Sequence, residues 1–346
     1  MMTSVLYVGQ MWHGGTCRER ARVLEANGWH VAPFDITPYQ SSGGPILRRL
    51  EDRLLAGPNV LRFNRDLLRQ VADLRNIDVV WIDKGRWLFA STLKELKQRT
   101  GAFLVHYTPD PAFVVHTSRH FQRCLPLYDL CVTTKRYELE AYRHAGAREV
   151  AFTWQGVDDR FSRIAECAAI DSPGRSGVVF IGHREPHYER ILTSIAQAGL
   201  ELSVYGQSWH RARWRNAELA PAIKGGPAWA DAYARTLARA KVGLGLLSKL
   251  YPDQFTTRSF EIPAAGAMLL AERTAEHQEL FDEGREAEFF ADTAELIDKL
   301  RFYLAHDAAR IAIAEKGRQR AITQHGWTRV MSPVLARIGS LTARGV

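Results

Sequence analysis

The chain has 346 residues, 46% of them hydrophobic and 24% charged, which suits two α/β domains of about 150 residues each. A formal net charge of +8 favours anionic partners such as nucleotide phosphates, lipid phosphates or anionic glycans. The arginines are dispersed and no nucleic-acid motif occurs, so direct nucleic-acid binding is not expected.

Cysteine usage and the N-terminus indicate the compartment. The four cysteines show no CxxC spacing and no histidines at zinc-ligand spacing, which favours free thiols in a reducing cytoplasm. The N-terminus lacks the basic start and long apolar core of a signal peptide, and no apolar run reaches about 18 residues. We expect a cytoplasmic protein, and the basic balance leaves peripheral attachment at the inner face of the membrane open.

Strands and helices alternate through the first half of the chain, as in a doubly wound α/β domain. The pattern predicts an irregular excursion over 35–58, with a flexible tip at 40–45. Helices are expected at 17–27, 64–75, 91–99 and 135–144. Strands are expected at 5–8, 30–34, 78–83, 103–107, 130–134 and 150–153.

The first strand runs into a glycine loop that contains Gly14 and Gly15. Thr16 can cap the helix that follows, and a glycine loop before a helix lets backbone N–H groups approach an anion. The loop does not match G-x-G-x-x-G, so a plain tight turn is an equal alternative.

Polar residues also end two later strands of this half. Asp83 and Lys84 follow one strand, and His106 and Asp110 end the next, in a loop stiffened by two prolines. Because ligands of parallel sheets sit beyond the carboxyl ends of the strands, these residues are candidate site residues. An ion pair between Asp83 and Lys84 is the structural alternative.

Residues 164–176 have the composition of a linker, and the α/β pattern restarts after them. A boundary near 165–176 therefore separates two α/β halves in tandem. A loop with aromatic and basic residues is expected at 209–214. Strands are expected at 177–182, 202–206, 242–247 and 288–290, and helices at 186–198, 228–239, 275–283, 293–304, 307–325 and 331–343, the last possibly returning to the first domain.

The stretch 253–272 combines a polar loop, a helix-compatible segment, a turn at Gly266 and a short apolar run typical of a buried parallel strand. Two carboxylates, Asp253 and Glu261, stand eight residues apart with Arg258 between them. This arrangement at a sheet edge is typical of a site.

These residues resemble a family. The two Rossmann-like halves, the D-x7-E spacing of Asp253 and Glu261, and the run 258–270 are similar to retaining GT-B glycosyltransferases of the GT4 type. More narrowly, the chain resembles the CgeB-like branch, with a "glycosyl transferases group 1" C-terminal domain. The similarity is best over 177–327.

The resemblance implies a GT-B fold, in which two Rossmann-like domains face across a cleft. An acceptor domain would comprise 1–168 with a C-terminal helix at 329–346, and a donor domain would comprise 169–328. The implied reaction moves a hexosyl group, with retention, from a UDP- or GDP-sugar to a glycan, a lipid-linked or another acceptor, as in polysaccharide biosynthesis. No Asp-x-Asp motif occurs, so neither a metal nor a separate cofactor is expected.

The resemblance also implies roles for individual residues. Glu261 matches the acid that binds the donor ribose, and Asp253 stands where the family usually has a glutamate near the donor sugar. Arg258 is expected either to contact the donor or to hold Glu261. The remaining donor-site candidates are Gly182 in the turn after the first strand, Arg184 and Arg190 at the phosphates, Lys249 as a competing cation, and Tyr205 with Gly206 near the base.

In the first half, His106 and Asp110 are expected to orient the acceptor or the donor sugar, and Gly14, Gly15 and Lys84 to line the diphosphate or acceptor side. Two other functions remain open at this point. One is a nucleotide-sugar epimerase of GT-B fold, and the other is a non-catalytic nucleotide- or glycan-binding protein on the same scaffold, which the aspartate at position 253 allows.

Overall fold

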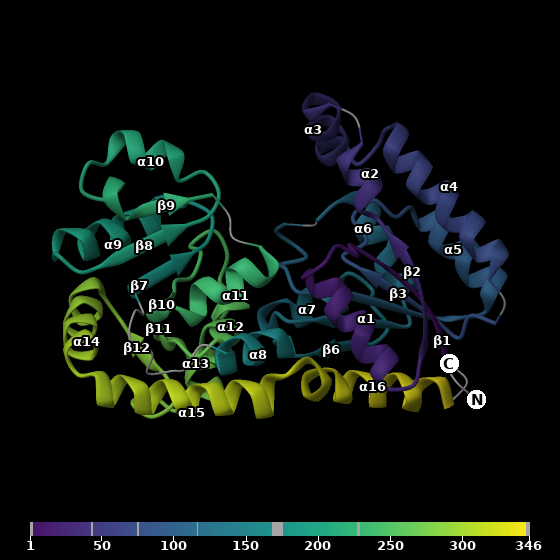
Figure 1. The fold of residues 1–346 in the computed structure, drawn as a ribbon. Helices are drawn as coiled ribbons and strands as arrows, with labels where there is room; N and C mark the ends of the chain where they lie inside the picture. The colour runs from purple at the N-terminus through teal and green to yellow at the C-terminus, as the bar shows by residue number, and fades with distance from the viewer. Residues whose placement is uncertain are drawn as a thin grey trace. The chain divides into compact units, whose positions relative to one another are not determined.

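The structure is a computed structural model that describes residues 3–42, 44–74, 76–115, 117–167, 176–226 and 229–343. The chain divides into two compact units, each described here by itself. Unit 1 comprises Met1–Trp154 and Val330–Val346, and unit 2 comprises Gln155–Arg329. Each unit is built on one parallel six-stranded sheet with helices packed around it (Figure 1).

The sheet of unit 1 has the strand order β2-β1-β3-β4-β5-β6. Its strands are β1 (Ser4–Gly9), β2 (His30–Asp35), β3 (Val79–Asp83), β4 (Phe103–Thr108), β5 (Leu130–Thr133) and β6 (Val150–Phe152). Its helices are α1 (Thr16–Ala26), α2 (Thr37–Ser41), α3 (Pro45–Leu54), α4 (Pro58–Asp73), α5 (Ala90–Thr100), α6 (Arg119–Cys124) and α7 (Leu139–His144), with 3-10 turns at Leu125–Leu127 and Arg136–Glu138.

The sheet of unit 2 has the order β12-β11-β10-β7-β8-β9. Its strands are β7 (Ser176–Ile181), β8 (Leu202–Tyr205), β9 (Ile223–Gly225), β10 (Ala240–Gly245), β11 (Met268–Glu272) and β12 (Glu288–Phe290). Its helices are α8 (Asp159–Cys167), α9 (Pro186–Gln197), α10 (His210–Arg215), α11 (Ala230–Ala238), α12 (Arg258–Ala264), α13 (Ala275–Leu280), α14 (Thr293–Ala305) and α15 (Asp307–His325), with a 3-10 turn at Ala220–Ala222.

The burial of the strands agrees with their positions in the two sheets. Every residue of β3 and β4 is buried, as expected for central parallel strands covered on both faces. In unit 1 one face packs side chains such as Val80 and Leu104 against Leu67 of α4 and Leu96 of α5. In unit 2 the order reverses between β7 and β10, which makes these two strands the topological switch point.

Several segments differ from the sequence prediction, which also lacked α6, α8 and β9. The stretch 35–58 is not an irregular excursion, because α2 and α3 occupy most of it, and each has a proline near its N-terminus that suits a helix start. Helix α4 likewise begins at Pro58, before the predicted 64–75. The predicted loop 209–214 is largely α10.

The division between the units lies at Trp154/Gln155, earlier than the expected 168/169. Helix α8 belongs to unit 2, where Phe161 packs edge-on against Tyr233 of α11, with ring centroids 5.9 Å apart. The greater part of the predicted linker, 168–175, lies outside the described residues.

The last helix, α16 (Trp327–Ala343), begins in unit 2 and continues in unit 1. Thr153 donates to the carbonyl of Val330 at 3.0 Å, and Arg337 pairs with Glu149 at 2.6 Å, both within unit 1. None of the helices in the described ranges is both long and apolar enough to cross a membrane.

Candidate functional site

The candidate donor site of unit 2 begins at its switch point, where the segments after β7 and β10 leave the sheet. Arg258, the first residue of α12, joins them. Its Nη2 donates to the carbonyl of Leu246 at 2.8 Å and its Nη1 to that of Ile181 at 3.4 Å. Arg258 therefore ties these two segments together, and neither of these bonds goes to Glu261, so both roles predicted for Arg258 stay predictions.

The turns after β7 and β8 pack tightly beside this edge. Trp209, almost fully buried, donates its indole N–H to the carbonyl of Gly182 at 2.7 Å. Gly206 has φ +137°, a conformation that favours glycine. The predicted site residues Gly182 and Gly206 are thus brought together.

Glu261 lies one turn into α12 and is partly buried. Its Oε2 accepts a hydrogen bond from the Tyr233 hydroxyl at 2.7 Å, and Oε1 accepts none from the described residues. Burial raises the pKa of this carboxyl, while the Tyr233 hydrogen bond and the nearby Arg160 and Arg258 oppose the rise. One carboxylate oxygen is therefore fixed and the other is available to a ligand hydroxyl.

Asp253 lies in the loop between β10 and α12 and is partly exposed. Two bonds hold the loop in place. Thr274 donates to the carbonyl of Gln254 at 2.7 Å, and the backbone N–H of Thr256 donates to Ser259 at 3.2 Å. Asp253 therefore sits on an anchored segment between the switch point and Glu261.

Lys249 is engaged by Glu272 at the end of β11. Glu272 also accepts from the backbone N–H of Leu247 at 2.7 Å and lies 3.7 Å from His187. Burial lowers the pKa of His187, and Glu272 opposes the shift. Glu272 was not predicted as a site residue, although an acid that ends a buried strand was the available signal.

The basic pair on the β7–α9 segment lines one open pocket, together with Glu189, Thr193 and other residues of α9. Arg184 forms an ion pair with Glu189 at 2.5 Å, and Arg190 is exposed on the helix. Tyr205 lines a different pocket with Arg235 and Arg239. The structure thus brings the two arginines together and places Tyr205 apart from them.

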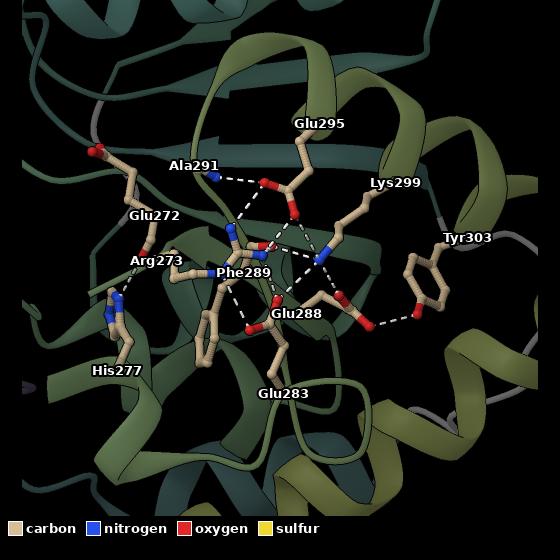
Figure 2. Close-up of polar contacts among 10 residues, drawn as sticks. All are labelled: Glu272, Arg273, His277, Glu283, Glu288, Phe289, Ala291, Glu295, Lys299 and Tyr303. Carbon is tan, nitrogen blue, oxygen red and sulfur yellow. Dashed lines mark hydrogen bonds and ion pairs between the residues drawn. The ribbon is translucent and has the colours of Figure 1, made fainter. Parts of the chain in front are cut away.

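A network of charged side chains closes the β11–β12 edge of unit 2 (Figure 2). Arg273 contacts Glu295 through both terminal nitrogens, at 2.6 and 3.0 Å, and Glu283 at 2.6 Å. Lys299 lies 2.6 Å from Glu288, whose other oxygen accepts from Tyr303 at 2.6 Å. The Arg273 hydrogen bonds lower the pKa of Glu295 to about 2. Because the cations and carboxylates satisfy one another, we read this network as structural.

In unit 1, Lys84 and Asp110 form an ion pair of 2.6 Å at the carboxyl ends of β3 and β4. Lys84 has φ +61°, a strained conformation for a residue with a side chain. It lines a cavity of about 440 Å³ together with other residues, among them Gln10, Gln40, Phe63, Arg86 and Trp87.

Asp83 does not pair with Lys84. Its carboxylate is buried, pairs with Arg20 at 2.7 Å and accepts a hydrogen bond from Tyr7. Arg20 also lies over the ring of Tyr107, with its guanidinium carbon 4.2 Å from the centroid. The structural alternative, an ion pair between Asp83 and Lys84, therefore does not form, because a buried arginine from α1 takes the carboxylate of Asp83.

His106 is completely buried on β4. Its Nε2 lies 3.1 Å from the Tyr142 hydroxyl, and the rings of Phe121 and Tyr128 pack within 5.4 Å of it. The side chain has no surface for a substrate, so the structure argues against the predicted orienting role and makes His106 a core residue.

Gly14 and Gly15 form a tight turn before α1. The N–H of Gly15 donates to the carbonyl of Trp12 at 3.1 Å, and Gly14 has φ +81°. Gly15, rather than Thr16, occupies the N-cap. Within the described residues, no cluster of three or more His, Cys, Asp or Glu side chains is arranged to hold a metal ion.

Comparisons with known proteins show what the chain is similar to. A family model described as "Glycosyl transferase-like" matches residues 184–336, which include the donor-site candidates Arg184, Arg190, Lys249, Asp253 and Glu261. No curated protein sequence matches the chain.

Solved structures match both units at low identity. Sucrose-phosphate synthase from Thermosynechococcus elongatus is 14% identical, with TM-score 0.70 over 99% of this chain and 100% of that one. The α,α-trehalose 6-phosphate synthase from Burkholderia multivorans is 14% identical, with TM-score 0.68 over all of both chains. Anabaena HepE, solved with UDP-glucose, is 14% identical, with TM-score 0.64 over 97% of this chain and 99% of that one. The chain therefore has the GT-B fold of two Rossmann-like domains, and residues 184–336 form a glycosyl transferase-like region.

Proposed function

We propose that the protein is a glycosyltransferase that moves a hexosyl group from a UDP- or GDP-sugar to a glycan or lipid-linked acceptor in the cytoplasm. The observation that carries the proposal is the state of Glu261, which has one oxygen fixed by Tyr233 and the other available beside the switch point. The family match over residues 184–336 and the UDP-glucose bound to HepE support the same reading.

In this proposal Glu261 accepts hydrogen bonds from the ribose hydroxyls of the donor. A partly buried carboxylate suits this role because hydrogen bonds to a charged group are stronger than neutral ones. Tyr233 fixes the carboxylate, so little ordering is required when the nucleotide binds. The closely packed turns at Gly182 and Gly206 let the nucleotide approach the backbone, with Tyr205 as a further base contact.

Catalysis requires stabilisation of the negative charge that grows on the leaving diphosphate. We propose that three cations stabilise this charge, namely Arg184, Arg190 and Lys249. They differ in whether an existing ion pair must break before they can bind phosphate. Arg184 and Lys249 must exchange Glu189 and Glu272 for phosphate, whereas Arg190 is already exposed. We propose that transfer retains the anomeric configuration and needs no metal, with Asp253 near the donor sugar.

Unit 1 would hold the acceptor. The cavity beside Lys84 combines amide, cationic and aromatic side chains, a mixture that suits sugar hydroxyls and ring faces. Asp110 holds Lys84 in place at the rim, with Gly14 and Gly15 in the neighbouring loop after β1.

Nucleotide binding tests the proposal first. A thermal-shift panel of UDP, GDP, CMP and ADP should show stabilisation by UDP or GDP, because a ligand that binds only the folded state raises its melting temperature. Glu261→Ala should weaken that nucleotide by about 10- to 100-fold, through loss of hydrogen bonds to a charged group. Glu315→Ala, an exposed carboxylate elsewhere in unit 2, is the matched control.

Donor turnover then separates the activities. Transfer with an acceptor present supports a transferase, whereas epimerisation or hydrolysis of the donor alone would favour an epimerase. Binding without any turnover would leave a binding protein. No stabilisation by any of the four nucleotides, or unchanged affinity in Glu261→Ala, would refute the donor site.

A further inference from the structure

Helix α3 exposes an aliphatic stripe. Ile46, Leu50 and Leu54 are 74%, 50% and 64% exposed, and their spacing of four residues places them on one face of the helix. Scattered exposed leucines are ordinary on protein surfaces, but three in register form a continuous apolar strip that favours contact with another apolar body.

A neighbouring side of α3 is firmly anchored. Glu51 is 1% exposed and accepts hydrogen bonds from the backbone and side-chain nitrogens of Asn59, both at 2.8 Å. Asn59 belongs to the first turn of α4, where Leu61 is a further exposed aliphatic residue, at 60%. Figure 1 shows α3 next to α2 within unit 1. The stripe is therefore the outward face of a fixed helix.

Positive charge flanks the stripe. Arg49 and Arg53 are exposed, and they lie four residues apart on the helix, next to Ile46, Leu50 and Leu54 around its circumference. Neither guanidinium forms an ion pair with a described residue. Aliphatic side chains bordered by arginines are the pattern of a helix that lies in a membrane interface.

We propose that the α3 face, defined as Ile46, Arg49, Leu50, Arg53 and Leu54, seats on an anionic lipid surface. The aliphatic side chains would enter the acyl boundary while the arginines contact lipid phosphates. A second copy of the chain fits less well, because a two-fold contact through this face would bring the same arginines together. A helix of ten residues is too short to span a bilayer, so it lies in the interface plane.

The position of α3 bears on the acceptor, a point that rests on the proposed function. Asp52, on another side of the helix, lines the unit 1 cavity, and Arg86 of the cavity wall donates to its carbonyl at 3.4 Å. A lipid surface under the α3 face would thus lie one helix width from the proposed acceptor cavity, which favours a lipid-linked acceptor.

Vesicle sedimentation of the full chain tests the proposal. The protein should bind weakly to vesicles of phosphatidylcholine alone. It should bind strongly to vesicles that also contain about 30% phosphatidylglycerol. Ile46→Ser, Leu50→Ser and Leu54→Ser combined should reduce binding by about ten-fold for each residue inserted. Arg49→Gln with Arg53→Gln should lose about five-fold per arginine, on anionic vesicles only.

The matched comparison is α10, which also exposes an apolar side chain among cations. Trp214 is 88% exposed between exposed Arg213 and Arg215, and Trp214→Ser with both arginines changed to glutamine should leave vesicle binding unchanged. The proposal would be overturned if the wild-type protein did not bind vesicles, or if the α3 variants bound them as well as the wild type. It would also be overturned if only the α10 variant lost vesicle binding. So would an α3-dependent dimer in sedimentation without vesicle binding. A nucleotide thermal shift on the same variants, expected to be unchanged, separates this outcome from failure of the donor site.

Discussion

Gly206 and Gly182 approach each other so closely that a Cβ atom on Gly206 would lie 1.9 Å from the carbonyl oxygen of Gly182. Each glycine directly follows a strand at the donor-site edge, and Trp209 donates to the carbonyl of Gly182 at 2.7 Å. The two turns are therefore held together by backbone contact that no side chain at position 206 can enter.

Gly206→Ala should destabilise unit 2 by more than about 3 kcal/mol, since it adds an overlap with backbone to an unfavourable φ. Gly199→Ala is the control. Gly199 also has positive φ, +72°, but an added Cβ would meet nothing within 4 Å, so this variant should lose only about 1 kcal/mol. Thermal unfolding measures both, and equal losses would contradict the close-contact argument.

Tyr233→Phe should weaken nucleotide binding without unfolding the protein. The hydroxyl fixes Glu261 and its hydrogen bond opposes the rise in the pKa of that carboxyl. Its removal should cost roughly 5- to 10-fold in affinity and shift the pKa of Glu261 further upward. Since the proposed function has the ionised form of Glu261 bind ribose, affinity should fall at a higher pH in the variant than in the wild type. Calorimetric titrations at several pH values check this, and coincident pH profiles would refute it.

Most of the strands and the switch-point stretch could be predicted from sequence because their signals are local, whereas the three-residue β9 was not predicted. The strand at 288–290 and the helix at 307–325 have the predicted bounds. Parallel strands read as apolar runs, and their carboxyl ends carry the polar residues of the site. Glu261, which lies within α12, was instead singled out from its spacing to Asp253 and from the family resemblance, and its role stays a prediction.

Other features depend on partners distant in sequence. His106 and Asp83 stand at strand ends like site residues, but Tyr142 and Arg20, 36 and 63 residues away, hold them in the interior. The alternation of a strand shows that two faces exist without showing which residues of other elements cover each face. The helix α3 was missed for a different reason, since flanking glycines and prolines suggested a loop.

Arg20→Met should be among the most damaging substitutions in unit 1. The Arg20–Asp83 pair is 0% and 1% exposed, and removal of one partner from a buried pair costs about 3–5 kcal/mol by leaving a buried charge. Arg99→Met breaks an exposed pair with Glu95 and should cost less than about 0.5 kcal/mol. Thermal melts compare the two. If Arg20→Met were as mild as Arg99→Met, the buried pair would contribute no stability.

Acid sensitivity should begin near pH 6.5 and depend on His277. This side chain is fully buried, and its Nε2 lies 2.8 Å from Ser259 of α12. Its Nδ1 lies 2.7 Å from the carbonyl of Glu272 (Figure 2). Burial lowers its pKa to about 4. The unfolded chain therefore takes up the proton first as pH falls from about 6.5 toward 4, and the free energy of unfolding decreases in that window.

The loss attributable to His277 should reach at most about 3 kcal/mol. Burial also lowers the pKa of His325 to about 4 and lowers that of His187, so His277→Gln should remove at most about half of the slope between about pH 7 and 5. The Glu295 carboxyl, with a pKa of about 2, adds stability that is lost only below about pH 4.5 and does not affect this window. His306→Gln, at an exposed position, should keep the wild-type slope. Urea unfolding at several pH values in this range measures the slope of the unfolding free energy against pH. If His277→Gln had the same slope as the wild type, the buried imidazole would not be the cause of the acid sensitivity.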